Sequence, residues 1–163
     1  MKDRVREAVF NLVGPEVAGK HAVDLFAGTG ALGLEALSRG AASATFVEQH
    51  FPTARIIRQN ASDLAVEDVC TVLPANTLLW SKRLPSLPPI PWVVFCSPPY
   101  DFYLERSAEM LALVSALLHA APPCSLFVVE ADERFDFAQL PQADQWDVRI
   151  YSPAVVAVLR LPA

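Results

Sequence analysis

The chain has 163 residues, of which 53% are hydrophobic and 19% charged, and its formal net charge at pH 7 is −5. This composition supplies a hydrophobic core for one domain and excludes a disordered or low-complexity protein. No apolar run reaches the length of a membrane helix and the start is too charged for a secretory signal, so we expect a cytoplasmic protein.

The first half of the chain alternates helix and strand patterns. Apolar residues at helical spacing predict amphipathic helices, and short apolar runs next to glycine predict buried strands. In chain order we expect a helix, a strand, a helix, a strand and a helix over residues 5–13, 21–26, 31–38, 44–48 and 53–64.

The second half begins with a proline-rich segment. Seven of the 14 prolines lie between Pro74 and Pro99, and they predict a surface loop that includes residues 85–91. The predicted elements after it are a strand, a helix and three strands, over residues 92–96, 103–120, 125–130, 146–151 and 154–161. Strands that alternate with helices pair in parallel through right-handed crossovers. We therefore predict an α/β fold with a mostly parallel, Rossmann-like sheet, an antiparallel C-terminal hairpin and helices on both faces.

A glycine-rich turn follows the first predicted strand. Residues 28–33, GTGALG, match GxGxxG between a strand and a helix, where a nucleotide-like ligand can approach the backbone closely. Glu48 ends the next strand, where a carboxylate can accept hydrogen bonds from both ribose hydroxyls. Loop and acid together favour a cofactor site over a plain tight turn.

Two cofactor classes use this geometry. A dinucleotide dehydrogenase normally needs a further substrate domain, for which 163 residues leave no room. S-adenosylmethionine is the alternative, and Asp24 favours it because a carboxylate attracts the positively charged methionine end of that cofactor. We expect S-adenosylmethionine, with S-adenosylhomocysteine as product; the structural alternative is a tight turn with Asp24 as a loop acid.

A Ser-Pro-Pro-Tyr turn at residues 97–100 follows the strand at 92–96. Its prolines fix the backbone and leave carbonyl oxygens without ladder partners at the edge of the sheet. Pro98 C=O and Ser97 Oγ can accept hydrogen bonds from a base amine while positive charge develops on it during methylation. Tyr100 can stack on the base. The alternative, a strand end with Tyr100 packed on the core, is less favoured because the glycine loop is also present.

The segment at residues 24–39, DLFAGTGALGLEALSR, together with Ser-Pro-Pro-Tyr, resembles the S-adenosylmethionine-dependent methyltransferases of the RsmD type. That family methylates a guanine N2 of small-subunit (16S) ribosomal RNA. Residues 3–11, Asn60 and Asn76 are also similar to its pattern. The resemblance implies ribosomal RNA, within a small-subunit particle, as the partner.

The resemblance also implies a fold and site roles. The fold would be a single class I methyltransferase domain over residues 1–163, with a helix and lead-in at 1–19 and a catalytic core at 20–163. The residues that would bind the cofactor are Asp24, Phe26, Gly28 and Gly30 at its methionine part, Glu48 at its ribose and Asn76 at its adenine region. Thr29 would be a further cofactor-binding residue. Those that would meet the target base are Ser97, Pro98 and Tyr100.

One departure from the family pattern concerns the turn. The family normally has Asp or Asn where this chain has Ser97, which is a neutral and weaker acceptor. Ser-Pro-Pro-Tyr is also similar to the turn of amino-group DNA methyltransferases that act on cytosine N4. A DNA amino-methyltransferase (cytosine N4 or adenine N6) and a weakly active or inactive cofactor-binding module are therefore the alternatives.

A second departure lies at the start, where the family usually carries a basic, glycine-containing segment and this chain has two residues before Asp3. We expect part of the RNA-binding surface to be missing. Arg4 and Arg6 are then the candidate RNA contacts, with Lys2 and the Lys82-Arg83 pair as further candidates, because phosphate affinity comes mainly from basic side chains. An ordinary solvated helix face is the alternative.

No metal site is expected, because the three histidines and three cysteines lack ligand spacing. Methyl transfer from a sulfonium also needs neither a metal nor a covalent nucleophile. Glu130, at the end of its predicted strand, is interpreted as a surface acid, and the alternative is that it lines the pocket. No oligomeric state is predicted.

Overall fold

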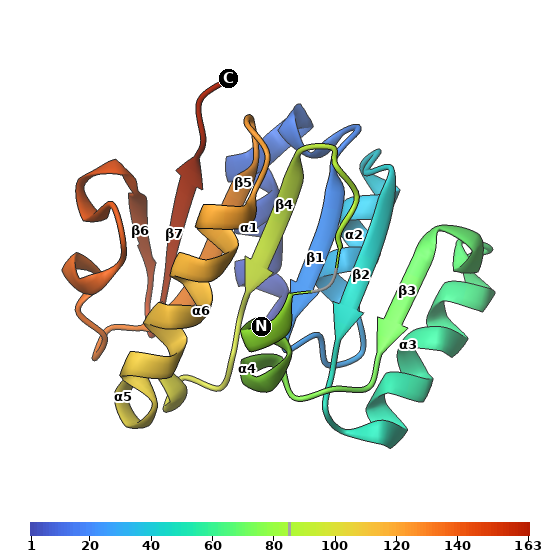
Figure 1. Cartoon of the computed structure of the whole chain (residues 1–163), viewed down its shortest axis with the longest axis horizontal. Coiled ribbons are helices and arrows are strands. Elements are labelled where there is room, and N and C mark those ends of the chain that lie inside the picture. Colours follow the sequence, from blue (N-terminus) through green and yellow to red (C-terminus); the bar gives the residue numbers. More distant parts are fainter. Residues whose placement is uncertain (85) are drawn as a thin grey trace.

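The computed structural model describes residues 1–84 and 86–163 and is built around a seven-stranded sheet (Figure 1). The strand order is β3-β2-β1-β4-β5-β7-β6. The strands are β1 (His21–Leu25), β2 (Ser43–Val47), β3 (Cys70–Leu73), β4 (Trp92–Cys96), β5 (Leu126–Asp132), β6 (Asp147–Tyr151) and β7 (Ala154–Arg160). The first five pair in parallel, while β7 runs antiparallel to both β5 and β6. The predicted α/β fold with a C-terminal hairpin is confirmed.

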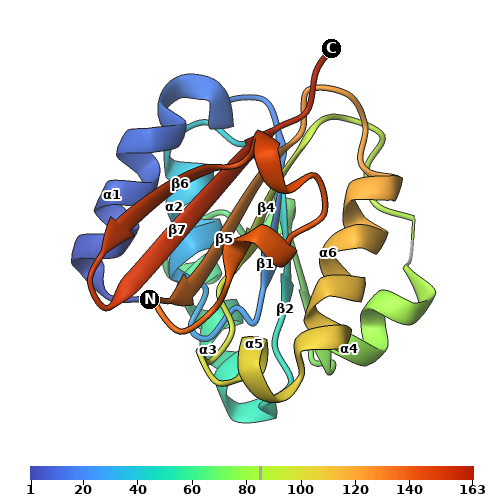
Figure 2. The same ribbon diagram turned by 90° about the vertical axis from the view of Figure 1, so that its left-hand side faces the viewer.

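Helices cover both faces of the sheet, and Figure 2 shows α1 and α2 on one side and α4 and α6 on the other. The α-helices are α1 (Asp3–Val13), α2 (Ala31–Ser38), α3 (Phe51–Asp63), α4 (Thr77–Trp80), α5 (Phe102–Glu105) and α6 (Ser107–Ala120). Short 3-10 turns are η1 (Gly14–Val17), η2 (Glu67–Val69), η3 (Ser81–Arg83), η4 (Phe137–Gln139) and η5 (Ala143–Gln145). Among the described residues, no helix combines the length and apolar character needed to cross a bilayer.

Each face of the sheet has its own hydrophobic core. Phe10, Phe46 and Phe95 are buried on the side of α1, α2 and α3. Tyr103 of α5 and Met110 of α6 are buried on the opposite side. Because β5 lies between two partner strands and two helical layers, all seven of its residues are buried.

The short helix α4 was not predicted, and several element ends shift by one or two residues. Three further differences concern β3, the region of α5 and α6, and β5. The strand β3 was not predicted, because it is a short edge strand whose residues are only partly buried or exposed. The helix predicted over residues 103–120 is divided at Arg106, where the backbone leaves the helical region, into α5 and α6. The strand β5 continues two residues beyond its predicted end at residue 130. Pro85, in the predicted proline-rich loop, lies outside the described residues.

The sheet topology places two turns side by side at the carboxyl edge of the sheet. The chain passes from β1 outward to β2 and β3 and then returns to β4 on the other side of β1, so the strand order reverses between β1 and β4. Ligands of open α/β sheets bind at such a point, beyond the carboxyl ends of the strands. The glycine loop follows β1 there and the Ser-Pro-Pro-Tyr turn follows β4.

Candidate active site

The glycine loop after β1 is a tight turn with left-handed backbone. Phe26, Gly28 and Gly30 have φ values of 52°, 58° and 90°, and the Gly30 N–H closes the turn on Ala27 C=O at 2.9 Å. Positive φ is uncommon for a bulky residue such as Phe26. A Cβ added to Gly28 would meet nothing within 4 Å. The Gly28 backbone therefore borders open space that a side chain would begin to fill.

The third glycine of the motif has a packing role. A Cβ on Gly33 would lie 2.4 Å from Phe46 Cε1, so its absence allows α2 to approach β2 closely. The Gly33 N–H also donates to Asp24 Oδ2 at 2.9 Å. This bond links the start of α2 to the buried β1.

Asp24 is 1% exposed, and its burial raises the pKa of the carboxyl to about 7, although the bond from Gly33 opposes this shift. A cavity of about 250 Å³ lies beside it. Its lining residues are Met1, Arg6, Asp24, Phe26, Ala27, Gly28, Thr29, Ala31, Leu32 and Ser97. Asp24, Phe26, Gly28 and Thr29 therefore lie around one cavity, as expected from the sequence, whereas Gly30 is buried against Ile57 and Phe46.

Glu48 joins the end of β2 to the glycine loop. Its Oε1 accepts the Gly28 N–H and its Oε2 accepts the His50 N–H, both at 2.9 Å. Because a carboxylate can accept about four hydrogen bonds, Glu48 retains capacity toward a ligand. Asn76 stands nearby, where its Oδ1 accepts the Leu79 N–H and its Nδ2 donates to Gln49, both at 3.1 Å. Asn76 thus begins the short helix α4.

A larger cavity of about 560 Å³ connects the predicted cofactor residues with the Ser-Pro-Pro-Tyr turn. Its lining residues are Met1, Lys2, Phe26, Glu48, Gln49, Asn76, Thr77, Leu78, Ser97, Pro98, Pro99, Tyr100, Phe102 and Glu130. Phe26 and Ser97 line both cavities. The two groups of residues that the sequence assigns to cofactor and to base therefore share one continuous region.

Glu130 corrects the sequence interpretation, because it is a buried acid at 1% exposure rather than a surface one. Ser97 Oγ donates to Glu130 Oε1, and Tyr100 OH donates to Glu130 Oε2 at 3.0 Å. Burial, and then the Glu130 charge, raises the pKa of Tyr100 to about 12, so Tyr100 stays a donor at neutral pH. Strand adjacency is the signal that reveals Glu130: β5 pairs in parallel with β4, so their carboxyl ends meet.

The turn is held from a second side by Arg134. This guanidinium donates to Asp101 Oδ1 and Asp132 Oδ2, both at 2.8 Å, and so ties the residue after Tyr100 to the end of β5. Pro98 is buried. Within the part of the chain that the structure describes, no donor reaches Pro98 C=O, which leaves this oxygen free to accept a hydrogen bond.

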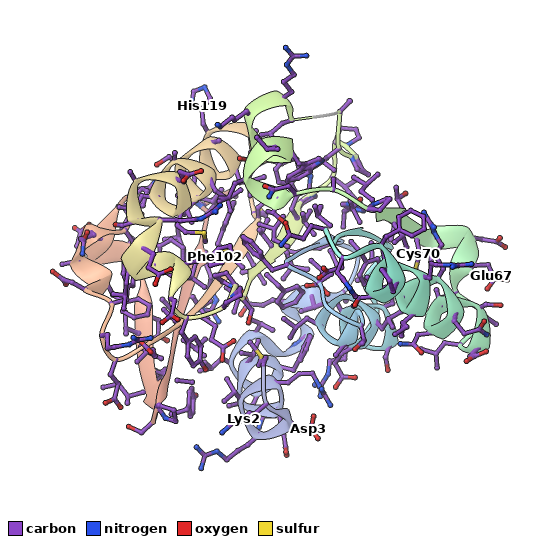
Figure 3. All side chains as sticks on the ribbon, turned by 90° about the horizontal axis from the view of Figure 1, so that it is seen from below. Lys2, Asp3, Glu67, Cys70, Phe102 and His119 are labelled. Carbon is purple, nitrogen blue, oxygen red and sulfur yellow. The ribbon has the colours of Figure 1, made fainter. Side chains whose placement is uncertain are left out.

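Aromatic side chains form one wall of the larger cavity. Phe26 and Phe102 pack edge to face with ring centroids 5.6 Å apart, and the Arg106 guanidinium lies 5.4 Å above the Phe102 ring. Figure 3 looks onto this end of the molecule and shows Phe102 in α5 and Lys2 just ahead of α1. The sequence interpretation did not include Phe102, because no motif marks it.

The two arginines predicted to contact RNA occupy different surroundings. Arg6 lines the smaller cavity and forms an ion pair of 3.0 Å with Asp3. Arg4 is exposed and donates to the C=O groups of Tyr151 and Ser152 at 3.4 and 3.3 Å, in the turn between β6 and β7. Of these two arginines, Arg6 lines a cavity of the site and Arg4 does not.

With this geometry established, comparison with known proteins identifies the family. The profile of the family described as "Conserved hypothetical protein 95" matches residues 1–159. The chain belongs to this family. It is 33% identical over 132 residues to "Ribosomal RNA small subunit methyltransferase D" of Haemophilus influenzae, a match that covers 80% of this chain and 66% of the relative. The RsmD-type resemblance is thereby confirmed. The chain spans between about a third and two thirds of the length of the curated relatives it matches.

Solved structures of similar proteins agree with this membership. A conserved hypothetical protein of Streptococcus pyogenes is 28% identical, with a TM-score of 0.77 and coverage of 97% of this chain and 95% of that chain. A 16S rRNA N2 methyltransferase of T. thermophilus, in complex with AdoMet and guanosine, is 19% identical with a TM-score of 0.74 over 95% of this chain and 41% of that one. At that identity the likeness shows the fold, which is the expected class I methyltransferase fold.

Proposed function

We propose that this member of the family is an S-adenosylmethionine-dependent methyltransferase that acts on an exocyclic amine of ribosomal RNA, namely a guanine N2 of the small subunit. One observation carries the proposal: the cavity of about 560 Å³ is lined on one side by Glu48 and Asn76 and on the other by the turn from Ser97 to Tyr100. The names of the curated relatives support ribosomal RNA as the substrate.

The residues around the two cavities fit the cofactor. The Glu48 carboxylate and the Asn76 amide offer hydrogen bonds to ribose hydroxyls and adenine, and the open space at Gly28 admits a ligand close to the backbone. Asp24 borders the smaller cavity, where its carboxylate would attract the positively charged methionine end. When bound, S-adenosylmethionine supplies a methyl group attached to a sulfonium sulfur, and the leaving group is a neutral thioether.

The turn from Ser97 to Tyr100 would hold the target base. Ser97 Oγ and Pro98 C=O are acceptors for the amine N–H groups, and they stabilise the positive charge that develops on nitrogen. The Tyr100 ring, fixed by its hydrogen bond to Glu130, offers an aromatic face for stacking. Positioning of the amine against the methyl carbon would then supply most of the rate enhancement.

The RNA would approach the carboxyl end of the sheet. Lys2 and Arg6 line the two cavities there and are the basic groups placed to meet phosphates near the target base. With a net charge of −5, specific contacts of this kind are expected to matter more than a general attraction to nucleic acid. A ribosomal substrate also agrees with the cytoplasmic location expected from the sequence.

Transfer of a labelled methyl group from S-adenosylmethionine tests the proposal. The acceptors are small ribosomal subunits that lack their native guanine methylation and, in parallel, unmethylated DNA of mixed sequence. We expect label in the ribosomal RNA and background counts in the DNA. Label in the DNA alone would favour the amino-methyltransferase alternative that Ser97 suggests. Cofactor binding without transfer to either acceptor would favour the inactive-module alternative.

A further inference from the structure

Glu130 is shared by the two hydroxyl groups of the proposed base-binding turn. Ser97 Oγ donates to one of its carboxylate oxygens and Tyr100 OH donates to the other, at 3.0 Å. The carboxylate is 1% exposed, yet it lines the larger cavity beside these two residues. It therefore lies directly behind the groups that would contact the target base.

The partners of Glu130 are unusual for a buried acid. Among the ion pairs of the described residues none involves Glu130, and Arg134, four residues further along the chain, pairs with Asp132 and Asp101. Burying a carboxylate without a cation is costly, and two neutral O–H donors offset only part of that cost. Such a group in a ligand cavity is a candidate for a functional role.

The Ser97–Glu130 bond fixes the direction of the serine hydroxyl. A hydroxyl has one proton and two lone pairs, so a Ser97 that donates to Glu130 can only accept from the cavity side. An amine N–H of a bound base would then meet an acceptor polarised by a full negative charge. The pair thus provides, through the serine, the charge that a carboxylate at position 97 would provide directly.

We propose that Glu130 is a positioning residue for the methyl transfer, orienting Ser97 as an acceptor and receiving through it the proton that the target amine loses. The inference rests on the proposed function. When the amine nitrogen attacks the methyl carbon, the N–C bond forms and the C–S bond breaks, with its electron pair remaining on sulfur. The amine N–H proton passes to Ser97 Oγ as the Ser97 proton passes to Glu130, which afterwards releases a proton to water.

The first test compares Glu130→Gln with wild type in single-turnover transfer to undermethylated small subunits. We expect a loss in rate of about 10²- to 10⁴-fold, the usual contribution of a proton acceptor. Cofactor affinity measured by calorimetry is expected to stay within about twofold, because Glu130 is not among the groups assigned to cofactor binding. Glu133→Gln, which removes an exposed acid three residues further on, is the matched control and is expected to keep the wild-type rate.

A second variant separates this role from a structural one. In Ser97→Asp two carboxylates face each other, so we expect slower transfer than in wild type. In the double variant Ser97→Asp/Glu130→Gln, the turn itself carries a negative charge at position 97, and the amide introduced at position 130 can donate a hydrogen bond to that carboxylate. Transfer is therefore expected to recover at least about tenfold over Glu130→Gln alone. A purely structural Glu130 would not be rescued by a charge at position 97.

The cofactor-free protein gives an independent readout through the ultraviolet titration of Tyr100. Removal of the Glu130 charge is expected to lower the Tyr100 pKa from about 12, because that charge adds to the effect of burial. The same charge contributes to the raised pKa of Tyr103, which is expected to fall as well. Tyr100→Phe assigns the signal among the three tyrosines. A wild type that transfers no methyl group would overturn the proposed function together with the inference. Wild-type transfer that Glu130→Gln leaves unchanged, or a Tyr100 pKa that does not fall, would overturn the inference alone.

Discussion

The Glu48 carboxylate accepts the Gly28 N–H at 2.9 Å, which couples the end of β2 to the glycine loop after β1. The same carboxylate also accepts the His50 N–H. A change at Glu48 therefore alters both a proposed ribose contact and the position of the loop that would surround the methionine part of the cofactor.

Glu48→Ala is expected to weaken binding of S-adenosylmethionine by about 10- to 100-fold, since hydrogen bonds to a charged group are worth about 1.5–3 kcal/mol each. Isothermal titration calorimetry on the purified protein measures this. Glu67→Ala removes an exposed acid in η2, at the opposite end of the sheet, and is the control that should bind normally. Equal affinities for wild type and Glu48→Ala would contradict the assignment.

Gly28 and Gly33 provide a matched pair of substitutions to alanine. At Gly28 the new Cβ enters open space at positive φ, so we expect about 1 kcal/mol lower stability but a much larger loss of cofactor affinity. At Gly33 the new Cβ collides with the Phe46 ring, so we expect about 1–3 kcal/mol lower stability. Urea unfolding and calorimetry of both variants distinguish the two roles. Normal cofactor binding by Gly28→Ala would argue against close approach at this loop.

Two buried groups are expected to give the stability opposing pH dependences. Burial raises the Asp24 pKa from 3.8 to about 7, so the folded state binds the extra proton and stability falls as pH rises between these values. Burial lowers the His21 pKa from 6.5 to about 4, so the unfolded state binds the extra proton and stability rises with pH over that range. Relative to wild type, Asp24→Asn should therefore show a steeper rise of stability with pH, and His21→Gln a steeper fall.

Urea denaturation of the three proteins at about pH 4.5, 5.5 and 6.5, values that lie inside both titration ranges, measures these slopes. His21 is held between the hydroxyls of Ser43 and Thr45, at 2.6 and 2.8 Å, so glutamine can keep part of that pairing. If neither substitution changes the slope of stability against pH, the Asp24 carboxyl and the His21 imidazole titrate in the folded protein as they do in the unfolded chain.

Much of the fold could be predicted from the sequence, because the patterns that mark its strands and helices are local. The strands β1, β2 and β4 are apolar runs that end in glycine, acid or proline, and their order with the intervening helices predicts the parallel sheet. The edge strand Cys70–Leu73 lacked such a signal, because it is only four residues long and partly exposed. The break at Arg106 was likewise invisible to helical periodicity, since the apolar spacing continues across it.

The site was predictable to the extent that it consists of motifs. The glycine loop, Glu48 and the Ser-Pro-Pro-Tyr turn each stand at a strand end, so the sheet brings them together. Glu130 carries no motif, and an acid after four apolar residues is easily interpreted as the exposed end of a strand. Its burial depends on the pairing of β5 with both β4 and β7, which is tertiary information.

Identification of the methylated nucleoside is the decisive test of the proposed function. Small subunits that lack their native guanine methylation are incubated with the protein and S-adenosylmethionine, and the ribosomal RNA is digested and analysed by mass spectrometry. We expect N2-methylguanosine at one position, formed by wild type and nearly lost in Glu130→Gln. A methyl group on a ring carbon or on a ribose, or the absence of any methylated nucleoside, would contradict the proposed function.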